Sequence, residues 1–419
     1  MSRKWWAIIV VAVLAVAAVT VGIATSRAQG TTSLQSLSVA QLLAKVSDAS
    51  KSTTAVSGDI TWSNGLIPGS DLTGLLGGQS SAPSSLSGLA LGGSGRIWLQ
   101  QGSGLRLESQ GSGSDFVVVA GKNGLWSYSS ATSTATHYTP LAGASTKTPT
   151  SSPSPQPSST DPLAAITAGL QRFASTGTVT MGPQTTVAGQ PSYLLVMTPA
   201  SVHTTVGSVQ VAIDAKTFVP LRVRVFAKGD TTATLSAGFT SVSYGHLGNS
   251  LFAFTAPAGA TVRSQALPSP QGLLGSATAT KPAAHQQLTL AAAKVKAAGY
   301  GLTLAAPSSP PSDLPFIGAM VTAPSKARGA TAVLHYGSGF GSVVVIESQG
   351  ASSQSTGLQQ QIASLPQGLI TAMTIAGGPG YELQTPLVNI AAWQHGTTTA
   401  VAAGLVPQTL FSQFLAAIH

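Results

Sequence analysis

Residues 208–227 read SVQVAIDAKTFVPLRVRVFA, and this stretch decides the fold. Val209, Val211 and Ile213 alternate with Gln210, Ala212 and Asp214. The same alternation of apolar and polar residues resumes at residue 221. Because side chains alternate between the two faces of a β-strand, each half has one apolar face. Two arginines share the other face of the second half, which we interpret as a solvated strand face. Without a helix between the halves, the pattern predicts antiparallel pairing.

Further strands extend this sheet on both sides. Strand-like alternation and turn residues predict additional strands at 56–62, 96–101, 105–109, 116–120, 125–129, 177–181, 193–198, 232–244 and 251–255. Asn123-Gly124 lies between two of them and is a strong hairpin signal. No long helical pattern separates successive strands, so we expect a purely antiparallel sheet without parallel crossovers.

Two helices are predicted beside this sheet. Ser38 and Gln41 form a capping box, and the apolar residues that follow recur at helical spacing, which predicts a helix over 38–50. Asp161 before Pro162 is typical of a helix start and predicts a second helix that ends near 174.

The remainder of the chain, 286–419, is expected to form a smaller α+β domain. A short helix at 287–298 precedes strands predicted at 318–322, 330–336, 342–348, 371–376, 380–385, 389–394 and 397–403. A last helix follows Pro407, with its apolar residues on one face.

Composition excludes several classes of function. The 419 residues include no Cys, which removes disulfides, thiol catalysis and Cys-ligated zinc. The net charge of +9 comes from scattered cations without a basic stripe, so nucleic-acid binding is not expected. The eleven carboxylates and seven His form no metal-ligand or catalytic motif, so we expect no metal, no cofactor and no enzyme activity. A hydrolase that uses one of the many Ser residues stays a distant alternative.

The N-terminus predicts the location of the protein. Arg3 and Lys4 precede an apolar run at 5–24, and Arg27 follows it. About 20 apolar residues can cross a bilayer, and the leading cations keep their end cytoplasmic. The segment 1–28 is therefore a transmembrane signal anchor, or a signal peptide that is cleaved after Ala28. In both cases the rest of the chain lies on the extracytoplasmic face, anchored to the cytoplasmic membrane or secreted.

Low-complexity stretches divide the rest. A Ser/Thr/Pro tract at 142–159 predicts a disordered insertion, and 264–285 reads as a linker. The loop at 68–95 is unusual because it is rich in leucine, and we interpret it as a candidate lid. Its lid residues are Leu72, Leu75, Leu76 and Leu89.

Over residues 34–263 the chain resembles the LolA/RseB-like lipoprotein-carrier superfamily, in its envelope members. The resemblance is carried by VAIDAK at 211–216 with PLRV at 220–223, and by FAFTAPAGA at 252–260. VLHYGSGF at 333–340 and AWQHG at 392–396 resemble a domain of unknown function that can follow such modules. The resemblance implies an α+β fold, in which a strongly curved antiparallel sheet, a half-barrel, wraps around helices and encloses a cavity for acyl chains. The loops at 68–95 and 142–159 are additions to the family pattern.

The apolar strand residues are the candidate lining of such a cavity. They are Ile60, Trp62, Ile97, Leu99, Val117, Val119, Trp126, Val209, Val211 and Ile213. The leading hypothesis is non-enzymatic binding of lipid or of lipoprotein acyl chains, which needs an apolar shape and no catalytic group. The alternative is a regulatory or sensor protein that contacts a membrane signalling partner.

Overall fold

The computed structural model describes residues 34–49, 55–66, 92–100, 103–111, 114–122, 124–140, 176–267, 288–324, 329–349 and 370–419. Within these ranges no helix has the length and apolar character needed to span a membrane. The predicted N-terminal segment 1–28, the tract 142–159, the helix ending near 174 and the four lid leucines lie outside the described residues.

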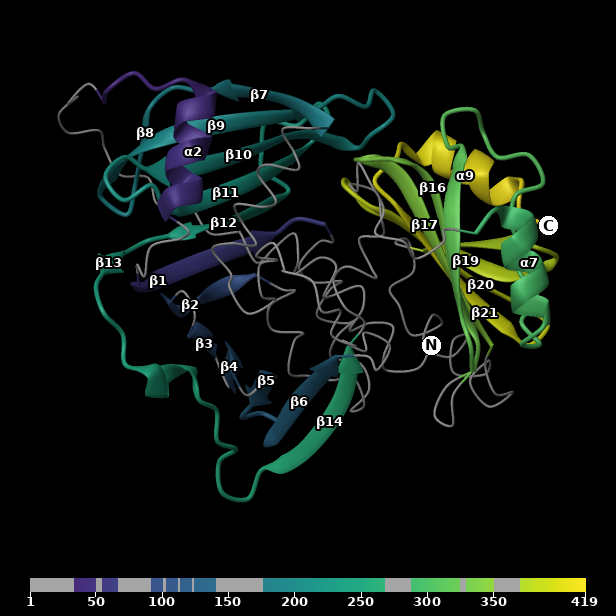
Figure 1. The fold of residues 1–419 in the computed structure, drawn as a ribbon, viewed down its shortest axis with the longest axis horizontal. Helices are drawn as coiled ribbons and strands as arrows, with labels where there is room; N and C mark the ends of the chain where they lie inside the picture. Colours follow the sequence, from purple (N-terminus) through teal and green to yellow (C-terminus); the bar gives the residue numbers. More distant parts are fainter. Residues whose placement is uncertain are drawn as a thin grey trace, which may run out of the picture.

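The described chain is predominantly β, with few helices and two large sheets. The first sheet has 14 strands: β1 (Ala55–Asn64), β2 (Gly93–Gln100), β3 (Gly104–Gly111), β4 (Ser114–Gly121), β5 (Gly124–Ser129), β6 (Thr134–Pro140), β7 (Gly177–Met181), β8 (Thr185–Val187), β9 (Gln190–Pro199), β10 (Val206–Asp214), β11 (Pro220–Ala227), β12 (Leu235–Phe239), β13 (Ser243–Tyr244) and β14 (Thr261–Leu267). Their order is β14-β6-β5-β4-β3-β2-β1-β12-β11-β10-β9-β7, with β13 on β1 and β8 on β9. Figure 1 shows these strands following one another along an arc.

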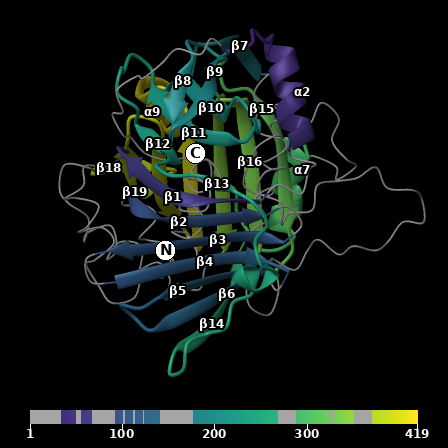
Figure 2. The same ribbon diagram turned by 90° about the vertical axis from the view of Figure 1, so that its left-hand side faces the viewer.

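The second sheet has seven strands: β15 (Phe316–Thr322), β16 (Thr331–Ser338), β17 (Gly341–Gln349), β18 (Ile370–Ile375), β19 (Gly378–Gln384), β20 (Asn389–His395) and β21 (Thr398–Gly404). Its order is β15-β16-β17-β21-β20-β19-β18, with every pair antiparallel. Figure 2, turned by 90° from Figure 1, shows this sheet behind the first.

Local sequence explains the described helices. Helix α2 (Val39–Ala49) begins with the predicted capping box, since the Ser38 N–H donates to Gln41 Oε1 at 2.9 Å and the Gln41 N–H donates to Ser38 Oγ at 3.2 Å. Leu42 and Val46 pack on Val211 and Ile213 of the first sheet. This helix covers one end of a sheet face.

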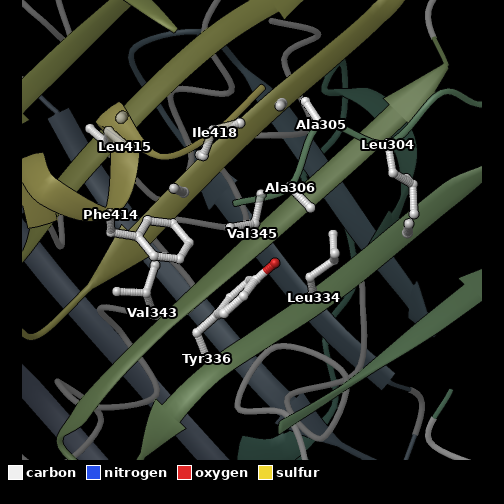
Figure 3. Packing of buried hydrophobic residues seen from close by; sticks show 14 of the residues in the cluster. Leu304, Ala305, Ala306, Leu334, Tyr336, Val343, Val345, Phe414, Leu415 and Ile418 are labelled. Carbon is white, nitrogen blue, oxygen red and sulfur yellow. The ribbon is translucent and has the colours of Figure 1, made fainter. Parts of the chain in front are cut away.

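Helices α7 (Leu290–Ala298) and α9 (Gln408–Ala416) cover the second sheet on the side turned away from the first (Figure 1). The predicted apolar face of α9 is buried. Figure 3 shows Phe414 against the ring of Tyr336, at a centroid distance of 4.8 Å, with Val343 and Val345 beside them. The core of this part therefore lies between the helices and one sheet face.

Three sequence predictions are corrected. The sheet is not purely antiparallel, because β14 pairs parallel with β6, with strands β7–β13 between them in the chain. The strand predicted at 251–255 is replaced by a 3₁₀ turn, Asn249–Phe252. The strand predicted at 232–244 is divided into β12 and β13, because the carbonyl of Asp59 accepts both the Thr240 and Ser241 N–H groups and bends the chain. Strands β6, β8 and β14 were not expected.

The turn between β10 and β11 is held by one buried carboxylate. Asp214 is 1% exposed, and its Oδ1 accepts the N–H groups of Lys216 and Thr217 at 2.7 and 2.8 Å. Its Oδ2 accepts the hydroxyl of Tyr244 in β13 at 2.6 Å. The aspartate of the 211–216 motif thus ties a hairpin to a strand about thirty residues later.

We expect Asp214→Ala to lower the free energy of unfolding by about 3 kcal/mol, because two backbone donors and one hydroxyl lose a charged acceptor. Tyr244→Phe removes one of these bonds and should cost about 1–2 kcal/mol. Urea unfolding measures both. Asp230→Ala, at an exposed turn residue, is the control and should stay within about 0.5 kcal/mol of the unsubstituted chain. An equal effect at 214 and 230 would contradict this role.

Candidate functional site

The register of the first sheet sorts the predicted lining residues. Residues paired directly across strands lie on the same face. Trp62 pairs with Ala237, which pairs with Val223, which pairs with Val211. In the other direction the same face continues from Gly58 to Ile97. We call this the Trp62 face, and it carries seven of the ten predicted residues: Ile60, Trp62, Ile97, Leu99, Val209, Val211 and Ile213.

The other three predicted residues lie on the opposite face, which we call the Trp126 face. Val117 pairs with Glu108, and Val119 pairs with Arg106 and Trp126. Trp126 stacks on His137 and Phe254 at centroid distances of 4.3 and 5.2 Å. The two faces cannot line one cavity, so these ten residues do not form one surface.

Sequence reasoning missed the residues that replace them. In β3 to β6 the Trp62 face carries Leu105, Leu107, Phe116, Val118, Leu125 and Tyr138. Strand β4 contains the run FVVVA, with large apolar residues at both odd-numbered and even-numbered positions. Alternation alone therefore could not show which face of the strand points to the core. Only the pairing with Leu107 shows that Val118 lies on the Trp62 face.

Burial divides the Trp62 face into two parts. Val211 and Ile213 are 1% and 0% exposed and form a core with α2. Trp62, Ile97 and other apolar residues toward β5 are only partly buried and pack on a layer of buried side chains. The partly buried residues are Trp62, Ile97, Leu105 and Leu125. These four side chains come from strands β1, β2, β3 and β5.

The Trp62 face is uncharged. In strands β1–β6 and β9–β12, every charged residue takes a position on the Trp126 face: Asp59, Arg96, Arg106, Glu108, Asp115, Asp214, Arg222 and Arg224. Burial and the neighbouring Arg224 lower the pKa of Arg222 to about 10, so Arg222 is less solvated than expected. Near β6 the Trp62 face turns polar, where Ser127 Oγ donates to Tyr138 Oη at 3.1 Å.

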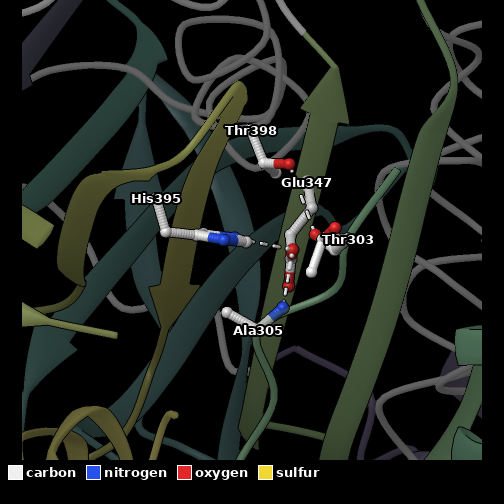
Figure 4. A network of polar contacts seen from close by, with 5 residues as sticks. All are labelled: Thr303, Ala305, Glu347, His395 and Thr398. Carbon is white, nitrogen blue, oxygen red and sulfur yellow. Dashed lines mark hydrogen bonds and ion pairs between the residues drawn. The ribbon is translucent and has the colours of Figure 1, made fainter. Parts of the chain in front are cut away.

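A separate polar cluster lies in the second sheet. Figure 4 shows Glu347 of β17, which is 0% exposed, with its Oε2 accepting the Ala305 N–H at 3.0 Å and 3.3 Å from His395 Nε2. Beside it Thr398 Oγ1 donates to the Thr303 carbonyl at 3.3 Å. Burial raises the pKa of Glu347, and the contacts with His395 and Ala305 oppose that rise. His395 also lines a hollow of about 280 Å³ that is formed by residues 376–379 and 394–396.

This cluster holds a loop and lacks the groups of a metal centre. Among the described residues no three His, Cys, Asp or Glu side chains gather closely enough to hold a metal ion. Glu347 instead fixes Ala305, in the loop that follows α7. We assign the pair a structural role.

The Glu347 carboxyl predicts a pH dependence of stability. The pKa of Glu347 in the folded chain lies above the ordinary 4.5. Its contribution to the free energy of unfolding is therefore full below pH 4.5 and is lost as the pH rises through the folded pKa. Relative to the unsubstituted chain, Glu347→Gln should therefore gain free energy of unfolding as pH rises. His395→Gln removes a contact that lowers the Glu347 pKa, so the loss should then extend to higher pH. Urea unfolding from pH 4 to 8 measures both, and parallel curves for the three chains would contradict the assignment.

Comparison with known proteins gives a likeness in fold only. No family model matches the chain, and no curated protein matches it. Among solved structures it is similar to the MucA/MucB complex of Pseudomonas aeruginosa, with 14% identity over 90% of this chain and 97% of that chain and a TM-score of 0.41. It is also similar to a LolA superfamily protein from Nitrosomonas europaea, with 8% identity over 52% and 99% and a TM-score of 0.19.

Proposed function

We propose that this chain is a non-enzymatic binding protein that holds an acyl chain of a lipid or lipoprotein on the Trp62 face. The observation that carries the proposal is the separation of charge in the first sheet. Every charged position of β1–β6 and β9–β12 lies on the Trp126 face, and the Trp62 face offers partly buried apolar side chains. Hydrocarbon is the ligand class that such a surface favours, since it needs no ionic partner.

The energetics are sufficient without catalytic groups. Burial of one methylene contributes roughly 0.8 kcal/mol, so ten buried carbons contribute on the order of 8 kcal/mol. The hydroxyls of Ser127 and Tyr138 at the β5–β6 end are buried and bond to each other, so this end of the Trp62 face also carries no charge. An acyl chain would therefore lie along the partly buried side chains between Leu125 and Trp62.

The N-terminal segment supports an extracytoplasmic location for this binding. Its apolar run and leading cations fit a signal anchor or a cleaved signal, and both deliver the sheets to the side where lipoproteins reside. A regulatory role, in which the chain contacts a membrane signalling protein, is the competing proposal. It requires a protein partner and no bound lipid.

Lipid mass spectrometry of the purified full chain tests the proposal. We expect acylated molecules at close to one per chain when the protein is made in a host with membranes. Ile97→Asp places a charge on the Trp62 face and should reduce the bound lipid at least tenfold. Trp98→Asp, one residue along the same strand but on the Trp126 face, is the matched control and should retain it.

Circular dichroism checks that both variants fold. Folded, lipid-free chain from several hosts would contradict acyl-chain binding. A membrane protein that copurifies with that lipid-free chain would favour the regulatory alternative.

A further inference from the structure

The second sheet has two apolar faces, although antiparallel sheets commonly have one wet face. The Tyr336 face packs under α7 and α9. We call the other face the Ile346 face. It is identified by the direct pairs of Ile346 with Val333 and with Val401. Its apolar residues are Met320, Val333, Val344, Ile346, Tyr381, Leu383, Ile390, Ala392, Val401 and Ala403.

The distribution of charge on this sheet is the reverse of the usual one. Its two carboxylates, Glu347 and Glu382, occupy the Tyr336 face, where both are buried. The Ile346 face holds no Asp, Glu, Lys or Arg in any of the seven strands. Its one histidine, His335, is 6% exposed, and burial lowers the pKa of that ring, which favours its neutral form.

This uncharged face is not fully covered. Val333, Val344 and Ile346 are partly buried, and Met320 is 40% exposed. Covering apolar side chains at such positions with another apolar surface is favourable.

The Ile346 face is continuous with the contact between the two sheets. Leu383 of this face packs in one cluster with Val209, Val225 and Leu235, which lie on the Trp62 face. A backbone hydrogen bond from the Thr205 N–H to the Leu405 carbonyl, at 2.9 Å, joins the chain segments beside that cluster. The two uncharged faces therefore meet at one apolar junction.

We infer that the Ile346 face is the second wall of the acyl-chain site, so that a bound chain contacts both sheets and borders the junction at Leu383. This inference rests on the proposed function and assigns the second sheet a direct part in it. The occupant is a hydrocarbon chain, because neither wall offers a charge and the junction that links them is apolar.

Photocrosslinking on the full chain tests the inference with palmitic acid that carries a terminal diazirine. We expect saturable label on residues 93–111 of the first sheet and also on residues 331–349 of the second, competed by unlabelled palmitate. Label on 93–111 alone would overturn the second wall and leave the proposed function intact. Absence of saturable label from both would overturn both. Label absent from 331–349 together with a dimer in light scattering would assign that face to a second copy.

Affinity measurements provide an independent readout. The double variant Val333→Thr with Ile346→Thr keeps β-branched side chains in the strands but adds hydroxyls to the Ile346 face. It should weaken palmitate binding at least fivefold, with the thermal midpoint recorded to confirm folding. Val295→Thr is the matched control, since Val295 is 75% exposed on α7, on the other side of the sheet, and should bind as the unsubstituted chain does. Equal affinities for the double variant and the control would overturn the inference.

Discussion

Val225 lies between Val209 and Leu235 in the first sheet, and all three pack in one cluster with Leu387 of the second part of the chain. This contact is apolar and is reinforced at its edge by the Thr205 N–H bond to Leu405. Because the side chains belong to paired strands, the contact fixes which face of the first sheet looks toward the second part. Everything proposed for ligand binding depends on that orientation, since a shift of one residue in the register would exchange the Trp62 and Trp126 faces.

The elements that sequence predicted well are those whose signals are local. The capping box of α2 involves residues three apart, and the strands at 208–227 are joined by a turn whose aspartate bonds within three residues. The failures are long-range. The break after β12 depends on Asp59, which lies about 180 residues away, and the parallel pairing of β14 with β6 joins segments more than 120 residues apart. No period in a local window contains such contacts.

The candidate site was predicted in part for the same reason. In β2 and β10 one set of alternating positions is clearly more apolar than the other. The residues predicted from that set, such as Ile97 and Val211, share a face. In β5 the larger side chain, Trp126, suggested the core side, whereas the paired strands place Leu125 and Ser127 on the Trp62 face. Trp126 satisfies its apolar surface by stacking on Phe254, from a segment that sequence analysis assigned to a strand. Side-chain size was therefore a poor predictor of the core-facing side where alternating positions on both faces of a strand are apolar.

A second apolar wall would increase the binding free energy of an acyl chain beyond what the first sheet alone can supply. A chain that lies on one sheet leaves about half of its surface in water, so ten methylenes would contribute on the order of 4 kcal/mol instead of about 8. A difference of about 4 kcal/mol is roughly a thousandfold in affinity, which separates transient contact from retention of a ligand. The Trp62 face is suited to contact, but its partly buried Trp62 and Ile97 supply only one side. The Ile346 face has the missing properties, since it is uncharged, only partly covered and continuous with the same junction. On the proposed function, an acyl chain held between both sheets would be retained much longer than one held by the first sheet alone, and this gives the apolar face opposite the helices of the second sheet a role in binding.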